Sequence, residues 1–276
     1  MVVGKGRLIS GMHMVGTNKA LGQHWLKNRV ILEEIADLAA YGVSEGGAED
    51  FVDKTEVEVC VEIGPGLGFL TSSLLRRFDK VVAVEFDERL AENLPKSFPG
   101  KNLEVINDDI LKYDFGKITE PYVIAGNIPY YITSPIIEKV LTLEQLPERV
   151  VLLVQKEVAE RILSKKETML SLFVKNRANT SAGPVVPAHE FTPPPKVDSQ
   201  VIVMKPHAPE VDEMVFDLIR RGFSSPRKKL IHNLAGLKEQ EELKRILEEC
   251  GVSPDVRPGD MNLKKWAELN KQLIDR

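Results

Sequence analysis

Residues 57–68 read Val-Glu-Val-Cys-Val-Glu-Ile-Gly-Pro-Gly-Leu-Gly, and this stretch decides the fold. Its first seven residues, rich in β-branched side chains, predict a buried strand. The glycines that follow predict a tight connection into an apolar-periodic helix over residues 70–78. Glycines at such a turn also let the backbone approach a ligand closely, although a simple strand-to-helix turn explains them equally well.

Further along the chain, short Val- and Ile-rich segments alternate with segments of helical apolar spacing. The strand-like segments are residues 81–85, 103–106, 122–125 and 150–154, and the helical ones include residues 31–40 and 158–162. Buried strands that alternate with helices predict an α/β domain with a doubly wound parallel sheet.

Several of these strands end in a polar residue: Glu85, Asp109 and Asn127 follow the second, third and fourth strands. Ligands of doubly wound sheets bind beyond the carboxyl ends of the strands. We therefore expect these side chains and the glycines at 64–68 to line one crevice, although each acid taken alone is better explained by a helix cap or an exposed loop.

The domain organisation follows from length and pattern. A chain of 276 residues suggests roughly two domains. The linker 205–210, rich in proline, precedes a purely helical pattern, so we predict a first domain over residues 19–205 and a second over residues 206–276. Residues 1–18 contain no apolar stretch long enough for a signal peptide and are predicted to be a flexible N-terminal extension.

Composition excludes several classes of protein. Hydrophobic residues make up 43% of the chain and the net charge is only −4, which argues against disorder. No run of about 18 apolar residues is present, so no membrane span is expected. The two cysteines, Cys60 and Cys250, lie far apart, and the histidines have no metal-ligand spacing. We expect a cytoplasmic protein with no structural disulfide and no metal.

Two basic clusters interrupt this balanced composition. Five cations and no acid occur between Lys5 and Arg29, and five more occur between Arg220 and Lys229 with no acid within that cluster. A lone cluster of this kind is usually a solvated face, but two clusters that flank one site favour nucleic-acid binding.

The spacing of the glycines indicates the kind of cofactor. A dinucleotide fingerprint would place a third glycine at position 69, which is Phe69 here. Glu85 lies about 20 residues beyond the glycines, where a carboxylate accepts hydrogen bonds from ribose hydroxyls and repels a nearby phosphate. Asp109 is placed to accept from an adenine amino group. The combination favours S-adenosylmethionine over a phosphorylated dinucleotide.

The segment Asn127-Ile128-Pro129-Tyr130 is the most informative short motif. The side-chain oxygen of Asn127 and the backbone carbonyl of Ile128, held by the rigid Pro129, are able to accept both N–H bonds of an exocyclic amine and favour its pyramidal form. Tyr130 would stack on the base. The alternative is an ordinary turn after a strand. Its position beside the other polar strand ends favours methyl transfer to a purine amine.

The chain resembles a known family over about residues 19–270. The segments that carry the resemblance are Ala20-Leu-Gly-Gln-His-Trp-Leu26, Val61–Gly68, Val84-Glu-Phe-Asp87, Gly126–Tyr130, Val154–Ile162, Phe191-Thr-Pro-Pro-Pro-Lys-Val-Asp-Ser199, Gly222-Phe-Ser-Ser-Pro-Arg-Lys-Lys229 and Gly251–Arg257. In this order they resemble the ribosomal RNA small-subunit adenine N6,N6-dimethyltransferases.

The resemblance implies a fold, an activity and a partner. The fold is a Rossmann-like class I S-adenosylmethionine-dependent methyltransferase sheet of seven strands with a small C-terminal all-helical domain that binds RNA. The activity is transfer of methyl groups to N6 of two adjacent adenosines in a hairpin loop near the 3′ end of 16S rRNA, which serves small-subunit biogenesis. The partner is small-subunit rRNA within a pre-30S particle, and the protein is expected to act as a monomer.

The resemblance also implies roles for individual residues. His24 and Leu26 would help hold the cofactor beneath an N-terminal lid, Gly64 and Gly66 would lie at its methionine part, and Asn127 would lie between the cofactor and the target. Phe191 would form the opposite wall of the target-base pocket; the less favoured alternative from the sequence alone is an aromatic that anchors the Pro-rich loop to the core.

One departure from the family pattern and three rival functions stay open. Residues 163–171 are shorter than the corresponding family loop and lack its Tyr-Gly-Arg sequence, which puts RNA contacts there in doubt. The rivals are a related large-subunit rRNA methyltransferase, a non-catalytic RNA-binding assembly factor and a nicotinamide dehydrogenase. The C-terminal match disfavours the first, the intact acids and Asn127 the second, and the glycine spacing the third.

Overall fold

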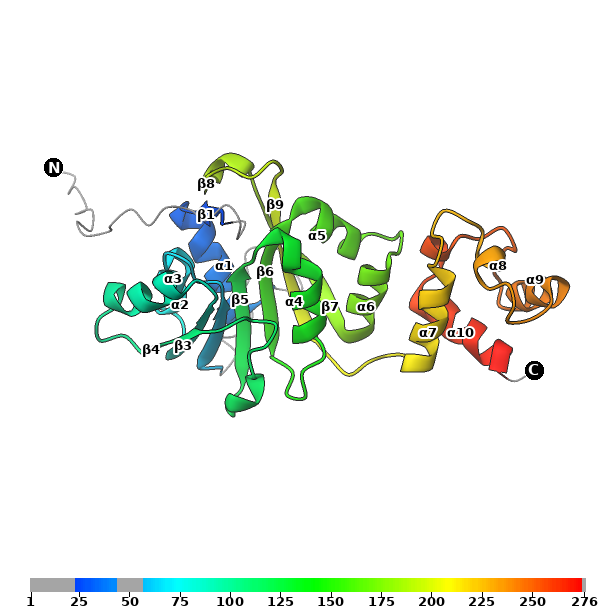
Figure 1. The fold of residues 1–276 in the computed structure, drawn as a ribbon, viewed down its shortest axis with the longest axis horizontal. Coiled ribbons are helices and arrows are strands. Elements are labelled where there is room, and N and C mark those ends of the chain that lie inside the picture. The colour runs from blue at the N-terminus through cyan, green and yellow to red at the C-terminus, as the bar shows by residue number, and fades with distance from the viewer. Residues whose placement is uncertain (1–22, 44–56, 275–276) are drawn as a thin grey trace.

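A computed structural model describes residues 23–43 and 57–274 (Figure 1). The predicted extension over residues 1–18 and the start of the segment 20–26 lie outside the described residues.

The core of the molecule is a seven-stranded sheet in the order β4-β3-β2-β5-β6-β9-β7 (Figure 1). Its strands are β2 (Val59–Ile63), β3 (Lys80–Glu85), β4 (Leu103–Asn107), β5 (Tyr122–Asn127), β6 (Arg149–Gln155), β7 (Ala178–Val186) and β9 (Ser199–Pro206). Strands β2 to β6 are parallel to one another, whereas β9 runs antiparallel to both β6 and β7. The predicted α/β fold with a mostly parallel sheet is confirmed.

Helices cover both faces of the sheet, as its nearly continuous apolar strands require. Those of the sheet domain are α1 (Arg29–Tyr41), α2 (Phe69–Leu74), α3 (Glu88–Asn93), α4 (Thr133–Val140), α5 (Lys156–Leu163) and α6 (Met169–Arg177). One apolar cluster joins α1 and α2 to the sheet, and a second joins α4, α5 and α6 to its other face.

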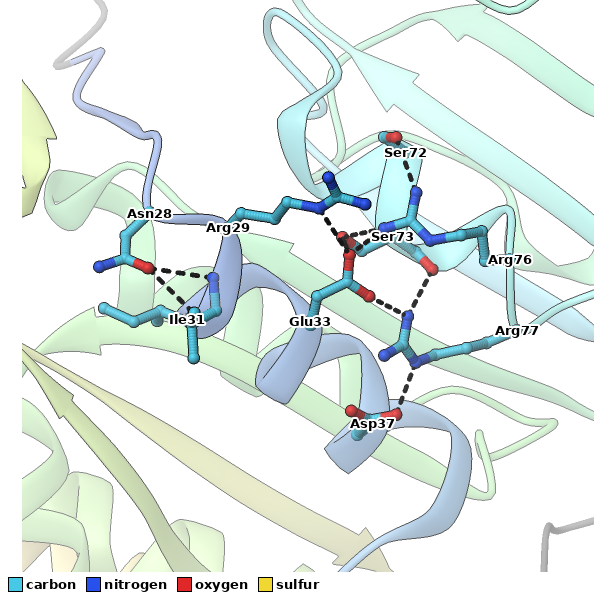
Figure 2. A network of polar contacts seen from close by, with 10 residues as sticks. Asn28, Arg29, Ile31, Glu33, Asp37, Ser72, Ser73, Arg76 and Arg77 are labelled. Atoms are coloured by element: carbon cyan, nitrogen blue, oxygen red, sulfur yellow. Dashed lines mark hydrogen bonds and ion pairs between the residues drawn. The ribbon is translucent and has the colours of Figure 1, made fainter. Parts of the chain in front are cut away.

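The helix predicted over residues 70–78 is shorter in the structure, because α2 ends at Leu74 and the chain continues as a turn. The turn carries Arg76 and Arg77, which reach across to α1 (Figure 2). The Arg77 guanidinium donates to Glu33 Oε2 at 2.7 Å and to Asp37 Oδ1 at 2.7 Å, and Arg76 also pairs with Glu33. This network fixes α1 against the helix that follows the glycine turn.

A second, two-stranded sheet pairs β1 (Trp25–Leu26) with β8 (Phe191–Thr192), so that Leu26 lies opposite Phe191. Asn28, just after β1, accepts hydrogen bonds from the first amides of α1 and donates to Glu190. The segment before α1 is thereby held against the chain that precedes β9.

Beyond Pro206, the described chain is helical: α7 (Glu213–Gly222), α8 (Leu230–Asn233), α9 (Gln240–Glu249) and α10 (Leu263–Ile274). They share an apolar cluster centred on Trp266, which Leu172 of α6 joins. The short loop between α5 and α6 also contacts this region, since the Glu167 amide donates to the Gly259 carbonyl at 2.7 Å. The helical region of the fold is confirmed; its assignment as an RNA-binding domain stays a prediction.

Candidate active site

The predicted polar strand ends line one cavity of about 260 Å³ at the carboxyl edge of the sheet. Of the predicted site residues, those that line it are His24, Leu26, Gly64, Gly66, Glu85, Asp109, Asn127, Pro129 and Tyr130. They come from the ends of four strands, β2, β3, β4 and β5, and from the segment before α1, and the parallel sheet brings them together.

The glycine turn forms one wall of this cavity. Gly64 and Gly66 have φ of +65° and +59°, backbone conformations that other residues rarely adopt. The Gly66 amide donates to Glu85 Oε2 at 2.9 Å. A side chain at Gly66 would also lie 3.4 Å from the Trp25 Nε1 atom, so the segment before α1 covers the turn closely.

Glu85, at the end of β3, is held by backbone amides on both oxygens. Its other oxygen, Oε1, accepts from the Asp87 amide at 2.8 Å. The side chain is only 6% exposed, and burial raises the pKa of Glu85, while the two amide bonds oppose that rise. The carboxylate is therefore fixed in direction, with lone pairs left to accept from a ligand.

Sequence reasoning missed Glu62, which also lines the cavity. The side chain is 1% exposed, and its Oε2 atom is buried without a hydrogen-bond partner among the described residues. Burial raises the pKa of Glu62 to about 8, and the nearby charge of Glu85 adds to the shift. A charged residue inside the otherwise apolar end of a buried strand was the available signal.

Asp109 lies in the loop after β4, and its Oδ1 atom accepts from the Leu111 amide at 3.0 Å. The neighbouring Asp108, not predicted, also lines the cavity. Lys139 of α4 anchors this loop by donating to the carbonyls of Leu111 at 2.9 Å and Tyr113 at 2.7 Å. The position of Asp109 therefore depends on a cation from another element.

Asn127, at the end of β5, has a fixed amide orientation. Its Nδ2 atom donates to the His24 carbonyl at 3.0 Å, which leaves Oδ1 as the free acceptor of the amide. The Tyr130 hydroxyl pairs with Ser199 Oγ at 2.6 Å, and its ring stacks on that of His24 with centroids 5.9 Å apart. Burial raises the pKa of Tyr130, so its hydroxyl is neutral at physiological pH.

Two predicted residues do not line the cavity. Ile128 is 1% exposed and packs in the core, which leaves only its backbone for the predicted role. Phe191 is 2% exposed and lies in the apolar cluster with its partner Leu26. Its position in β8 places the Phe191 side chain in this cluster, as the anchoring alternative expects, and its role in the wall of a base pocket stays a prediction.

Residues 23–43 and 57–274 contain neither a cluster of metal-binding side chains nor a membrane-spanning helix. Within these ranges, His, Cys, Asp and Glu side chains form no group of three or more with metal-binding geometry. The helices of the same part of the chain are too short or too polar to span a membrane.

Comparison with known proteins identifies the family. The model of the family described as ribosomal RNA adenine dimethylase matches residues 14–275. The chain belongs to this family. Its members include proteins named ribosomal RNA small subunit methyltransferase A from Nostoc sp., 35% identical over 94% of this chain and 99% of the relative, and from Bacillus mycoides, 36% identical over 93% and 91%.

Two solved structures share the fold of this chain. A dimethyladenosine transferase from Plasmodium falciparum is 27% identical, with a TM-score of 0.73 over 90% of this chain and 98% of its own. The 23S rRNA methyltransferase ErmE is 24% identical, with a TM-score of 0.72 over 91% and 100%, which shows a common fold. The family resemblance inferred from the motifs is confirmed, and membership implies S-adenosylmethionine as methyl donor.

Proposed function

We propose that this protein transfers methyl groups from S-adenosylmethionine to N6 of adenosine in 16S small-subunit rRNA, giving N6,N6-dimethyladenosine. The observation that carries the proposal is the fixed amide of Asn127, which leaves its oxygen free and lines the same cavity as the glycine turn, Glu85 and Asp109. The relatives named small subunit methyltransferase A favour the small subunit as substrate. We further propose two adjacent adenosines of one hairpin loop near the 3′ end as targets.

The order of the strands supports a direction for the cofactor. Asp109, Glu85 and the glycine turn follow β4, β3 and β2, which are neighbours in that order, and Asn127 follows the next strand, β5. A cofactor with adenine at Asp109 and ribose at Glu85 would extend along this edge with its methionine part at Gly64 and Gly66. Its reactive end would then lie beside Asn127.

The buried carboxyl group of Glu62 shows a feature that bears on whether the cavity fits this cofactor. A buried carboxylate oxygen without a partner is costly unless a ligand supplies a hydrogen-bond donor or a cation. The amino group of the methionine part is such a donor. We propose that Glu62 accepts from it, which would lower the raised pKa of this carboxyl when the cofactor binds.

The chemistry needs the protein mainly to orient the amine. When bound, the cofactor supplies an electrophilic methyl group. The Asn127 Oδ1 atom and the Ile128 carbonyl accept from the two N6 hydrogens, which concentrates the nitrogen lone pair toward the methyl group. After transfer the amine carries a positive charge and loses one proton to solvent, so no strong general base is needed. The second transfer then requires that the site accommodates one methyl group on N6.

The second basic cluster, residues 220–229, contains cations with and without an acidic partner among the described residues. Arg220 pairs with Glu213 and Asp217, and Lys229 pairs with Asp255 at 2.7 Å. Arg227 and Lys228 are exposed. We propose that these two residues contact RNA phosphates. We further propose that the rRNA is bound within a pre-30S particle in the cytoplasm and that the protein acts as a monomer. Binding would then weaken steeply with salt.

Methyl transfer to small subunits from cells that lack this modification tests the proposal. Radioactive S-adenosylmethionine should label 16S rRNA, and mass spectrometry should find N6,N6-dimethyladenosine there. Large subunits serve as the matched control and should stay unlabelled. Labelling of the large subunit alone would favour the 23S alternative, and cofactor binding without labelling of either subunit would leave only a non-catalytic RNA binder.

A further inference from the structure

Among the described residues, two aromatic side chains are highly exposed, and both line the same cavity. Among the described residues, the exposed large hydrophobic side chains include only two aromatic ones, Phe86 at 62% and Tyr131 at 63%. Both line the cavity of the candidate active site. Single exposed apolar residues need no explanation, but exposed aromatic rings confined to the mouth of one site indicate a surface that a ligand covers.

The backbone around Tyr131 is held firmly, although its own ring is free. Tyr131 lies in a 3₁₀ helix, Tyr130–Ile132, directly before α4. On one side the Tyr130 hydroxyl is bonded to the buried Ser199, and on the other side Ile132 packs against the core. The described part of the chain gives the Tyr131 side chain no hydrogen bond and no stacked ring. The fold therefore presents this ring in a fixed place at little further cost in conformational entropy.

The two exposed rings belong to different ends of the cavity. Phe86 directly follows Glu85 at the end of β3, where we place the cofactor ribose. Tyr131 lies four residues beyond Asn127, after β5, where we place the target amine. A cofactor bound as proposed would extend along the edge from β4 to β2, so Phe86 would be suited to cover the cofactor and Tyr131 to meet the RNA.

We propose that Tyr131 is a substrate-positioning residue that stacks on the nucleobase next to the target adenosine. The inference rests on the proposed function. An adenosine that enters the cavity leaves its stack, and the neighbouring base then exposes a bare aromatic face to water. The Tyr131 ring covers that face. Because every base has such a face, stacking serves either of two adjacent adenosines, whichever neighbour remains outside the cavity.

Three variants and two readouts test this proposal. In Tyr131→Ala, we expect KM for the small subunit to rise about tenfold, within the range measured for loss of one base–aromatic stack, with the cofactor dissociation constant unchanged. Tyr131→Phe keeps the ring and should stay within about twofold of the wild-type KM. Phe86→Ala removes the other exposed ring and should show the reverse pattern, with weaker cofactor binding and little change in KM for the subunit.

A short RNA with 2-aminopurine beside the target adenosine supplies a direct signal. Its fluorescence should be quenched on binding to the wild type and to Tyr131→Phe, and not on binding to Tyr131→Ala. An active wild type together with a Tyr131→Ala variant of equal KM and equal quenching would overturn the inference and leave the proposed function intact. Weaker cofactor binding in Tyr131→Ala would also overturn it, by placing the ring on the cofactor. A wild type that binds subunits without methylating them would refute both.

Discussion

Replacement of Glu62 by glutamine should make the stability of the cofactor-free protein less sensitive to pH. The carboxyl group is 1% exposed, and burial raises its pKa from 4.5 to about 8. Between these two values the folded protein carries a proton on Glu62 that the unfolded chain has lost. Folding therefore takes up a proton in this pH window. As a result, the free energy of unfolding declines as pH rises toward the pKa of Glu62 in the folded protein.

The size of the effect follows from proton linkage. One proton of difference between the two states changes the free energy of unfolding by about 1.4 kcal/mol per pH unit. From about pH 5.5 to about pH 7, both within the window, the wild type should lose about 2 kcal/mol through Glu62 alone. We do not reduce this value for screening by solvent, because the Glu62 carboxyl group is buried. Glutamine has no proton to lose, so the Glu62→Gln variant should lack this loss.

Urea unfolding of the wild type and the variant at both pH values measures the difference. From the lower to the higher pH, the free energy of unfolding of the variant should rise by about 2 kcal/mol relative to that of the wild type. This holds whatever the stability of the variant at the lower pH. Glu58→Gln is the matched control, since Glu58 lies just before the same strand with an exposed side chain. A gap between wild type and Glu62→Gln that stays constant with pH, or an equal change in Glu58→Gln, would refute the assignment of a buried, protonated Glu62.

Three further substitutions test the site. Asn127→Ala should lower kcat about 100-fold while changing cofactor affinity little, as single-turnover transfer and calorimetry would show, and near-normal turnover would contradict its role at the amine. Glu85→Ala should raise the cofactor dissociation constant about tenfold or more, and unchanged affinity would count against the ribose assignment. Lys139→Met removes the donor to the carbonyls of Leu111 and Tyr113. It should weaken cofactor binding about tenfold, with Lys139→Arg less affected; equal loss in both would argue against the anchoring role.

Much of the fold could be predicted because its parallel strands are buried on both faces. A strand of this kind is a short apolar run, and β2, β3, β5 and β6 were each predicted within about two residues of their bounds in the structure. Strand β7 was not located, since it lies at the sheet edge and begins with the polar sequence Ala-Asn-Thr-Ser. Strand β4 at the opposite edge was predicted, because Leu103, Val105 and Ile106 mark it, whereas β7 has no such apolar start, and β9 was not located either.

The site was predictable where strand order alone determines position. Glu85 and Asn127 end β3 and β5, the two parallel strands that flank β2, so the topology places them at one edge without further information. Lys139 was not predictable, because its role depends on how α4 packs against a loop 28 residues earlier in the chain. The inward direction of Phe191 likewise depends on its pairing with β1 and on no local pattern.

The segment before α1 links the two halves of the proposed reaction. The His24 carbonyl accepts from Asn127 and so sets which atom of that amide is left as acceptor. In the same segment, Trp25 covers Gly66 of the glycine turn, and Leu26 is tied to β8. If the Asn127 amide were released from His24, it would be free to turn its Nδ2 group toward the target amine. Its hydrogens would then face and repel the N6 hydrogens. The acceptor geometry at Asn127 and the cover over the cofactor therefore depend on the same few residues, and we infer that the site is competent only when this segment is in place.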